Sequence, residues 1–323
     1  MPGIKKSIIK KILRRKINSW LNTIETEEVR KAICRDAIIT GGAIVSLLQG
    51  FKPNDYDVYF KTNDTAEIVA NHYVDEFSAV KAKLSSIAPS ALNPKVLRIN
   101  RKNIRGYTEE RVGIYIKSAG VIGEGQDEYR YFESETDATT EDFIDSLPVG
   151  NKDLKEVFDH IKKERKQLFK PIFFSENAIT LSEKMQIILR FTGNVDQIHE
   201  NYDFVHTTCS YEYSTDTLKL PGEALEAILS KSLIYKGSLY PVASIFRLRK
   251  FIQRGWRITA GQLLKIMFQI SEINLYDYGT LREQLIGVDA AYMRELLAAI
   301  KDDKPEVIDG AYLCGVIDKI FEE

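Results

Sequence analysis

Two acidic residues separated by one position are the strongest chemical signal in this sequence. Asp55 and Asp57 flank Tyr56, and the bulky residues around them predict a β-strand. Side chains two positions apart in a strand lie on the same face, so the two carboxylates should lie side by side. Neighbouring carboxylates repel each other, and Mg²⁺, which prefers oxygen ligands, removes that cost. We therefore predict a metal-binding acid pair at the start of a strand.

A glycine pair lies about a dozen residues before these acids. Gly41 and Gly42 directly precede an apolar segment that predicts a short helix. Glycines allow the backbone amides at a helix start to approach a phosphate closely. Ser46 and Lys52 are further candidate phosphate ligands in the same stretch. A phosphate-binding turn beside metal-binding carboxylates is the arrangement that nucleotidyl transfer needs. The alternative interpretation of this segment is an ordinary turn followed by a solvent-exposed strand end.

The order of these residues resembles the signature of the DNA polymerase beta-type nucleotidyltransferase superfamily. That signature is Gly-Gly or Gly-Ser followed, about a dozen residues later, by Asp-apolar-Asp-apolar. With Leu47, Leu48 and Gly50 between the two elements, the segment is most similar to the head of tRNA CCA-adding enzymes and bacterial poly(A) polymerases. The resemblance implies a mixed-sheet head that binds two Mg²⁺ ions through Asp55 and Asp57, with an NTP such as ATP as substrate.

The resemblance also implies a third carboxylate on a neighbouring strand. The predicted strand 185–191 contains no acid, so Asp203, in a predicted strand at 202–206, is the candidate third catalytic and metal-binding residue. In CCA-adding enzymes the matching Asp contacts the sugar of the nucleotide, which gives Asp203 a competing role. A third interpretation is a buried carboxylate that accepts hydrogen bonds from the backbone or from Arg190.

Residues 240–258 resemble the neck helix of the same enzymes, with Pro241 and Gly255 in matching places. In this alignment only Arg249 falls on a family arginine, and Arg247 supplies a charge at a shifted position. Both are candidate ligands of a triphosphate or a nucleic acid, although a solvent-exposed basic face is an equal alternative. The family element that selects CTP or ATP has no counterpart here, so CCA addition is not predicted.

The composition is that of an ordinary globular protein. The 323 residues are 44% hydrophobic and 28% charged with a net charge of −1, as expected of a globular protein without a global attraction to nucleic acid. Three scattered cysteines give neither a disulfide framework nor a zinc motif. No apolar run approaches the ~20 residues that span a bilayer, and no secretory signal is evident, so we expect a cytoplasmic protein.

Residues 4–21 predict a basic amphipathic helix. The predicted apolar face consists of Ile8, Ile12, Leu13, Ile17, Trp20 and Leu21. One interpretation of the basic face is an arm that contacts the phosphates of RNA or DNA. The alternatives are a helix packed on the head with its basic face in solvent, and a helix that lies on a membrane surface.

The chain as a whole predicts an α+β fold in three parts. These are N-terminal helices at 1–36, a nucleotidyltransferase head at 37–220 with an insertion at about 80–175, and an α-helical neck and body at 221–323. Within the insertion we expect strands between 95 and 135, a polar loop at 133–148 and a helix at 151–168. The body should contain helices near 222–231, 241–254, 260–273, 279–286 and 289–301.

These patterns predict an Mg²⁺-dependent nucleotidyltransferase that moves an NMP from an NTP to an acceptor, with an RNA 3′ end as the favoured acceptor. Three alternatives remain open. The acceptor could be a protein or a small molecule, the head could be a catalytically idle binding module, or the protein could bind a nucleotide as a sensor without transferring it.

Overall fold

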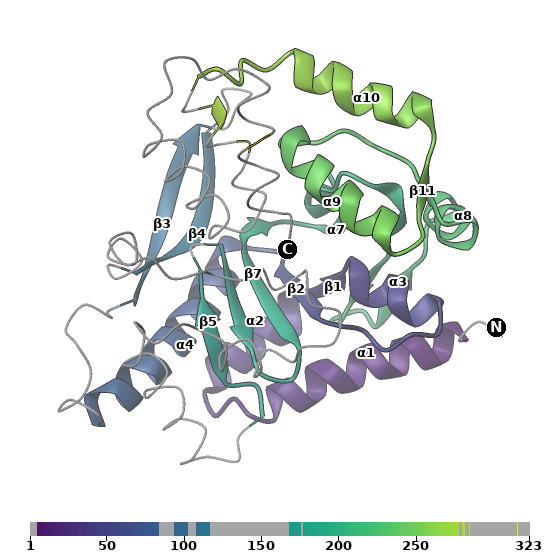
Figure 1. The fold of residues 1–323 in the computed structure, drawn as a ribbon. Helices are drawn as coiled ribbons and strands as arrows, with labels where there is room; N and C mark the ends of the chain where they lie inside the picture. Colours follow the sequence, from purple (N-terminus) through teal and green to yellow (C-terminus); the bar gives the residue numbers. More distant parts are fainter. Residues whose placement is uncertain are drawn as a thin grey trace.

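The computed structural model describes residues 5–83, 94–102, 108–116, 168–175 and 177–277, together with Thr280, Leu281, Gln284 and Gly315. The architecture is mixed α+β, which confirms the predicted fold class at this level (Figure 1). Among the described residues, no helix is both long and apolar enough to cross a membrane.

A seven-stranded mixed sheet forms the centre of the fold. From one edge to the other its strands are β5 (Pro171–Phe174), β6 (Ala178–Leu181), β7 (Met185–Thr192), β2 (Tyr56–Phe60), β1 (Ala37–Thr40), β8 (Ser210–Glu212) and β9 (Thr217–Lys219). β2 and β7 run parallel, and the other neighbours are antiparallel. The predicted strands at 37–40, 178–181 and 185–191 are therefore confirmed, whereas β5, β8 and β9 were not predicted.

The register of three strands brings the motif residues to one end of the sheet. Ile39 of β1 lies opposite Val58 of β2, and Asp57 of β2 is in register with Gln186 of β7. Because β1 is antiparallel to β2 while β7 is parallel to it, the end of β1 and the starts of β2 and β7 meet at the same end.

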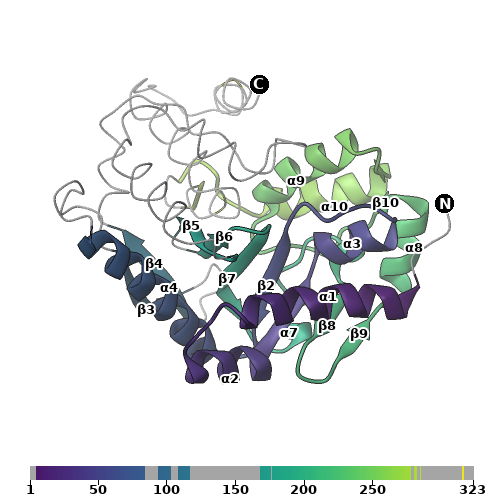
Figure 2. The ribbon, with the colours of Figure 1, turned by 90° about the horizontal axis from the view of Figure 1, so that it is seen from below.

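Helices pack around this sheet (Figure 2). They are α1 (Lys6–Leu21), α2 (Glu27–Asp36), α3 (Gly42–Leu48), α4 (Asn63–Lys83), α7 (Val195–His199), the 3₁₀ helix η4 (Val205–Thr207), α8 (Gly222–Ser230), α9 (Pro241–Gln253) and α10 (Ala260–Ser271). The predicted helices at 4–21, 26–35 and 65–77 are confirmed as α1, α2 and a longer α4.

The buried stripe of α1 differs by one position from the predicted face. Ile9, Leu13 and Ile17, spaced by four residues, are fully buried, whereas Ile8 is 47% exposed. A four-residue spacing keeps side chains on one helix face, and Ile8 lies about 100° away from Ile9. The stripe ends at Trp20, whose Nε1 donates a hydrogen bond to the hydroxyl of Tyr73 in α4 at 2.6 Å.

Several basic side chains of α1 contact the rest of the molecule. Lys10 Nζ lies 2.9 Å and Arg14 Nη1 lies 3.4 Å from the carboxylate of Asp216. Lys16 donates a hydrogen bond to the backbone carbonyl of Glu183. These contacts fit the interpretation of α1 as a helix packed on the head, and binding of nucleic acid by its basic face stays a prediction.

The predicted strand at 202–206 is wrong. Val205–Thr207 forms η4, and the extended backbone before it contributes only an isolated bridge between Phe204 and Tyr235. The cause is local, because the hydroxyls of Thr207 and Thr208 bond back to the carbonyls of Phe204 and Val205, both at 2.8 Å. Such bonds favour turns over a sheet ladder.

Three helices of the C-terminal part, α8, α9 and α10, lie where the sequence predicts them. They are joined by a small parallel pair that was not predicted, β10 (Ser232–Leu233) with β11 (Arg257–Ile258). The predicted helices at 279–286 and 289–301 fall almost entirely outside the described residues. Leu233, Leu248 and Trp256 belong to the same hydrophobic core as the sheet, so this core continues across the predicted boundary at 221.

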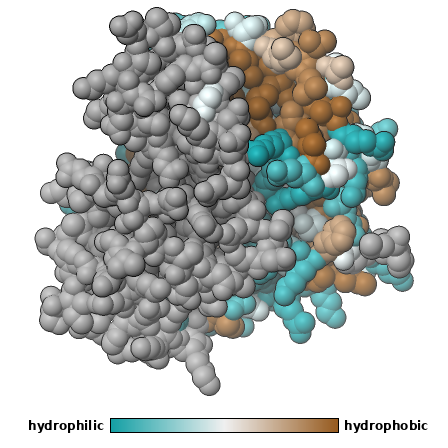
Figure 3. All heavy atoms as spheres, viewed as in Figure 1, coloured by the Kyte–Doolittle hydropathy of each residue, from teal (hydrophilic) through white to brown (hydrophobic). Residues whose placement is uncertain are grey.

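A buried histidine joins α9 to the head. The ring of His206 in η4 lies 4.6 Å from the ring of Phe251 and 4.2 Å from that of Trp256. Burial lowers the pKa of His206 to about 4, so the ring is neutral at neutral pH and packs as an aromatic side chain. On the outer side, exposed apolar side chains of α9 and α10 gather on one face (Figure 3).

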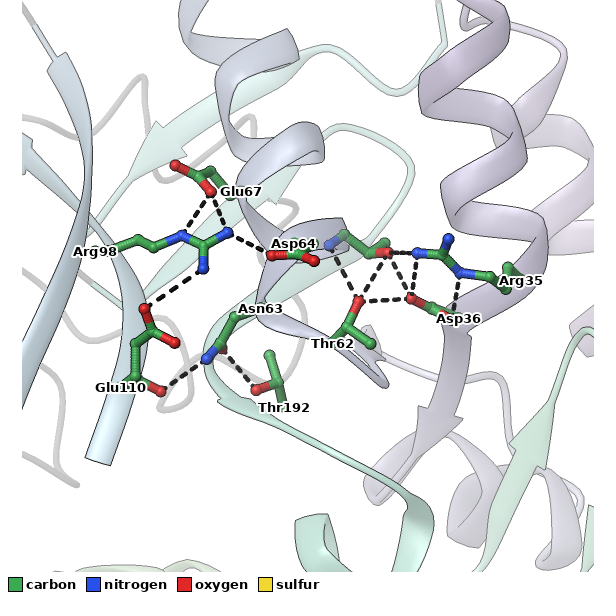
Figure 4. Close-up of polar contacts among 10 residues, drawn as sticks. Arg35, Asp36, Thr62, Asn63, Asp64, Glu67, Arg98, Glu110 and Thr192 are labelled. Carbon is green, nitrogen blue, oxygen red and sulfur yellow. Dashed lines mark hydrogen bonds and ion pairs between the residues drawn. The ribbon is translucent and has the colours of Figure 1, made fainter. Parts of the chain in front are cut away.

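In the predicted insertion, β3 (Pro94–Lys102) and β4 (Thr108–Ile116) form an antiparallel hairpin. Arg98 ties the hairpin to α4 through Asp64 and Glu67, and also bonds to Glu110 (Figure 4). The remainder of the predicted strand region, from 117 to 135, lies outside the described residues, as do the predicted loop at 133–148 and the predicted helix at 151–168 apart from its last residue.

A buried carboxylate joins α2 to the start of α4. Asp36 is 3% exposed and accepts hydrogen bonds from Arg35, Thr65 and Thr62 at 3.0, 2.5 and 2.8 Å (Figure 4). Burial alone would raise the pKa of Asp36, but these donors outweigh it and hold the pKa below its ordinary value. Asp36 directly precedes β1, so this cluster anchors the strand that leads to the glycine pair.

We predict that Asp36→Ala lowers the free energy of unfolding by about 2–4 kcal/mol, because it removes the acceptor of a guanidinium and two hydroxyls. Urea unfolding followed by circular dichroism measures this change. Glu27→Ala is the matched control, since it breaks only exposed ion pairs on the same helix and should have a much smaller effect. Equal losses in the two variants would contradict the role given to Asp36.

Candidate active site at the end of the sheet

Asp57 and Gly41 lie against each other where β1 ends and β2 begins. Extending the β1–β2 register places Asp57 opposite Thr40, the residue before Gly41. A Cβ built on Gly41 would lie 3.6 Å from Asp57 Oδ2. The structure therefore joins two motif residues that are separated in sequence, and we call Gly41, Asp55 and Asp57 the carboxylate edge.

Asp55 lies one residue before β2 and is exposed, whereas Asp57 lies within β2 and is half-buried. The ladder begins directly after Asp55, because the amide of Tyr56 donates to the carbonyl of Lys184 at 2.8 Å. The side chain of Tyr56 is buried in the main core. The alternation of a strand therefore directs Asp57 to the opposite face of the sheet, away from that core.

Only the first glycine of the pair has a conformation that requires glycine. Gly41 has φ of 91° and ψ of −145° and caps α3, while Gly42 begins the helix with nothing within 4 Å of a Cβ built on it. A positive φ of this kind is strained for any side chain. Gly41 thus allows the chain to turn directly beside Asp57.

Tyr202 lies over this turn. A Cβ on Gly41 would lie 3.6 Å from its hydroxyl, and its ring centroid lies 6.2 Å from Tyr59 and 4.9 Å from His199. Burial raises the pKa of Tyr202, and the charge of Asp57 raises it further, so the phenol keeps its proton and can donate. Sequence reasoning did not identify Tyr202, because this contact depends on how the chain folds after α7.

A hydrogen-bonded pair supports the end of β1. The hydroxyl of Thr40 donates to the carbonyl of Cys209 at 2.8 Å and lies 2.7 Å from His199 Nε2. Since the hydroxyl proton goes to that carbonyl, Nε2 must carry the hydrogen of the second bond. Burial, helped by the charge of Lys236, lowers the pKa of His199 to about 4. His199 therefore acts as a neutral support for the strand end rather than as a proton-transfer group.

The structure places Asp203 in an ion pair. The residue is 6% exposed, and its Oδ2 accepts a hydrogen bond from Arg247 Nη1 of α9 at 2.6 Å. The donor is thus Arg247 rather than Arg190. In the described part of the chain, no group of three His, Cys, Asp or Glu side chains has an arrangement that could hold a metal ion. Metal ligation by Asp203 stays a prediction, and its observed partner is a cation.

The comparison with known families covers the region that contains the carboxylate edge. The model of the Gabija anti-defense 2 family (Gad2) matches residues 11–231. The chain belongs to this family. No curated protein matches the chain. The Gad2 match includes the whole seven-stranded sheet and Gly41, Asp55, Asp57 and Asp203, and it ends before α9.

The remaining candidate ligands lie on both sides of the Gad2 boundary. Within the Gad2 region, Ser46 is half-buried on α3 and Lys52 is exposed before β2. Beyond it, Arg247 is half-buried and held by Asp203, while Arg249 is exposed on α9. The structure thus brings Arg247 to Asp203 and Asp57 to Gly41, and leaves the roles of Ser46, Lys52 and Arg249 as predictions.

A second contact holds α9 against the sheet. The guanidinium of Arg190 in β7 lies 4.5 Å from the ring centroid of Tyr240, the residue that caps α9. This cation–π contact and the Asp203–Arg247 pair fix both the start and the middle of α9 on the head. The Gad2 region thus carries the residues that position this helix, although the helix lies outside the match.

We predict that Gly41→Ala lowers the free energy of unfolding by about 1–3 kcal/mol, because alanine must adopt a conformation that favours glycine. Gly42→Ala is the matched control and should change stability by less than about 0.5 kcal/mol, since its Cβ meets open space in a helical position. Thermal unfolding of both variants measures the difference. Equal stability of the two variants would contradict the strained turn at Gly41.

We predict that Arg247→Met lowers the free energy of unfolding by about 2–3 kcal/mol, because it leaves the carboxylate of Asp203 buried without its cation. Adding Asp203→Asn should restore much of this loss, since the remaining group is neutral. Arg254→Met, an exposed residue at the end of the same helix, is the control and should have little effect. Additive losses in the double variant would argue against a direct pair.

Proposed function

We propose that this protein is an Mg²⁺-dependent nucleotidyltransferase with a nucleotidyltransferase-type head. The observation that carries the proposal is the carboxylate edge, where Asp57 lies against the Gly41 turn at the end of β1. The sequence resemblance to polymerase beta-type enzymes predicts that these two elements meet, and the register of β1 and β2 supports it.

The acid pair fits the metal that the resemblance implies. Asp55 is exposed and Asp57 is half-buried, so their oxygens can reach a hydrated cation without burial of an unpaired charge. Hard carboxylate oxygens are the ligands that Mg²⁺ prefers. Asp55 and Asp57 would hold the two ions, and bound Mg²⁺ supplies positive charge that offsets the charge of a triphosphate.

The protein's own groups have complementary roles in this proposal. The amides at Gly41 and Gly42 would approach the phosphates, because neither residue carries a side chain that blocks them. Ser46 and Lys52 would add donors, and the protonated Tyr202 would donate from above the turn. In the reaction an acceptor hydroxyl loses its proton to solvent and its oxygen forms a bond to the α-phosphorus of the NTP. The bond between that phosphorus and the oxygen that bridges the α- and β-phosphates breaks, and pyrophosphate leaves.

The family suggests where this activity is used. The name of the Gad2 family describes an action against the Gabija defence. We therefore propose that the acceptor is a component of that defence. An RNA 3′ end remains the acceptor favoured by the basic helix α1. The pairing of Lys10 and Arg14 with Asp216 occupies part of that basic face, and a protein or small-molecule component is the alternative acceptor.

The decisive variant is Asp55→Asn with Asp57→Asn, which keeps the shape of both side chains but removes their charges. We predict that it reduces incorporation of label from α-labelled NTPs, in the presence of Mg²⁺, by at least about 100-fold, because the metal loses its carboxylate ligands. The control is Asp196→Asn. Asp196 is an exposed aspartate of α7 that pairs with Lys219, and this variant should retain activity.

Circular dichroism of the double variant should match the wild type. Transfer by the double variant at the wild-type rate would refute the proposal, and a folded wild type that never transfers label would favour an idle binding module. Analysis of the labelled product as RNA, protein or small molecule identifies the acceptor. An extract from cells that carry the Gabija defence should contain it, and a matched extract without the defence should not.

A further inference from the structure

An ammonium group is held under the carboxylate edge. Lys16 of α1 donates to the carbonyl of Glu183, in the turn between β6 and β7. Its Nζ lies 4.9 Å from the ring centroid of Tyr56 and 5.1 Å from that of Phe169. Tyr56 is the residue between the two acids of the edge, so this cation lies on the core side of the same strand start.

Two further lysines belong to the segments next to this position. Lys184 follows Glu183 in the turn, and its carbonyl accepts a hydrogen bond from the amide of Tyr56 at 2.8 Å. Lys52 lies three residues before Asp55 on the loop that enters β2. Burial lowers the pKa of Lys16, and the nearby charges of Lys184 and Lys52 lower it further, whereas Glu183 acts in the opposite direction.

Lys16 differs in its surroundings from Lys10 and Arg14 on the same helix. Lys10 and Arg14 both lie against the carboxylate of Asp216, which neutralises part of their charge. At Lys16 the charges of Lys184 and Lys52 act together with its own, and the charge of Glu183 opposes them. Like charges at close range repel each other. A bound anion with several negative charges would relieve that repulsion, and Lys52 and Lys184 are accessible enough to reach one.

We infer that Lys16, Lys52 and Lys184 form a binding site, here called the lysine site, for phosphate groups of the substrate that reacts at the carboxylate edge. The inference rests on the proposed function for the identity of that substrate. The shared chemistry is a row of phosphates, which comes either from the triphosphate of the NTP or from the backbone of a nucleic-acid acceptor. Lysine suits such ligands because its ammonium is a compact point charge that needs no fixed geometry.

The test is the variant Lys52→Gln with Lys184→Asn, measured by isothermal titration calorimetry. Asparagine tolerates the positive φ of 56° at position 184. The titrants are inorganic tripolyphosphate, an Mg²⁺-bound non-hydrolysable NTP and a single-stranded RNA oligonucleotide. For at least one titrant we expect roughly tenfold weaker binding than in the wild type and a smaller dependence on salt, because two charges are lost.

The control variant is Lys31→Gln with Lys265→Gln, which removes two exposed lysines elsewhere and should bind all three titrants like the wild type. Weaker binding of tripolyphosphate and NTP assigns the site to the triphosphate, and weaker binding of RNA alone assigns it to the acceptor. Unchanged affinity for all three titrants overturns the inference. If the double variant does not fold, Lys16→Met, which keeps the aliphatic stem, provides the same comparison.

These outcomes are separable from those of the proposed function. Asp55→Asn with Asp57→Asn leaves the lysines in place, so it should bind metal-free tripolyphosphate as tightly as the wild type. A wild type that binds tripolyphosphate through the lysines but transfers no nucleotide would refute the function and retain the site. A lysine variant with wild-type affinities and wild-type transfer would refute the site and retain the function.

Discussion

The antiparallel pairing of β1 with β2 determines where the acid pair lies relative to the glycine turn. It places Asp57 opposite Thr40, and the positive φ of Gly41 then lets the chain turn away without displacing that carboxylate. A shift of one residue would move Asp57 to the core side, away from the turn at Gly41, and would expose the apolar side chains that now face the core. The buried residues of both strands therefore fix the position of the acid pair.

The supports of this pairing come from both ends of β1. At its start, Asp36 joins α2 to α4 through hydroxyl and guanidinium donors. At its end, Thr40 is held by His199 and by the carbonyl of Cys209. The charges around this end of the sheet differ between its two faces. Asp57 of the carboxylate edge points away from the core, whereas Lys16 lies on the core side at Tyr56. The Asp203–Arg247 pair joins α9 to the head. Such a division suits a substrate with both phosphates and metal ions.

Much of the fold could be predicted from the sequence because long periodic segments contain the information locally. The helical spacing of apolar residues predicted α1, α4 and α8 to α10. The glycine pair and the acids predicted the order of β1, α3 and β2. The elements and contacts that the sequence did not predict correctly depend on distant contacts or lie in short segments. Strands of three or four residues such as β8 and β9 carry too little pattern. Asp203 does not lie in a strand, because the hydroxyls of Thr207 and Thr208 donate to nearby backbone carbonyls and favour a turn. The approach of Tyr202 to Gly41 depends on tertiary packing alone.

We propose that metal and nucleotide meet at Asp55 and Asp57, and anomalous scattering locates a bound metal in a crystal. Crystals of the wild type, grown with Mn²⁺ in place of Mg²⁺ and a non-hydrolysable NTP, should show anomalous peaks about 2 Å from oxygens of both aspartates, with the triphosphate beside Gly41 and Gly42. Peaks at this place should be absent from crystals of the Asp55→Asn, Asp57→Asn variant. A nucleotide bound elsewhere, or Mn²⁺ peaks that contact neither aspartate, would contradict the claim.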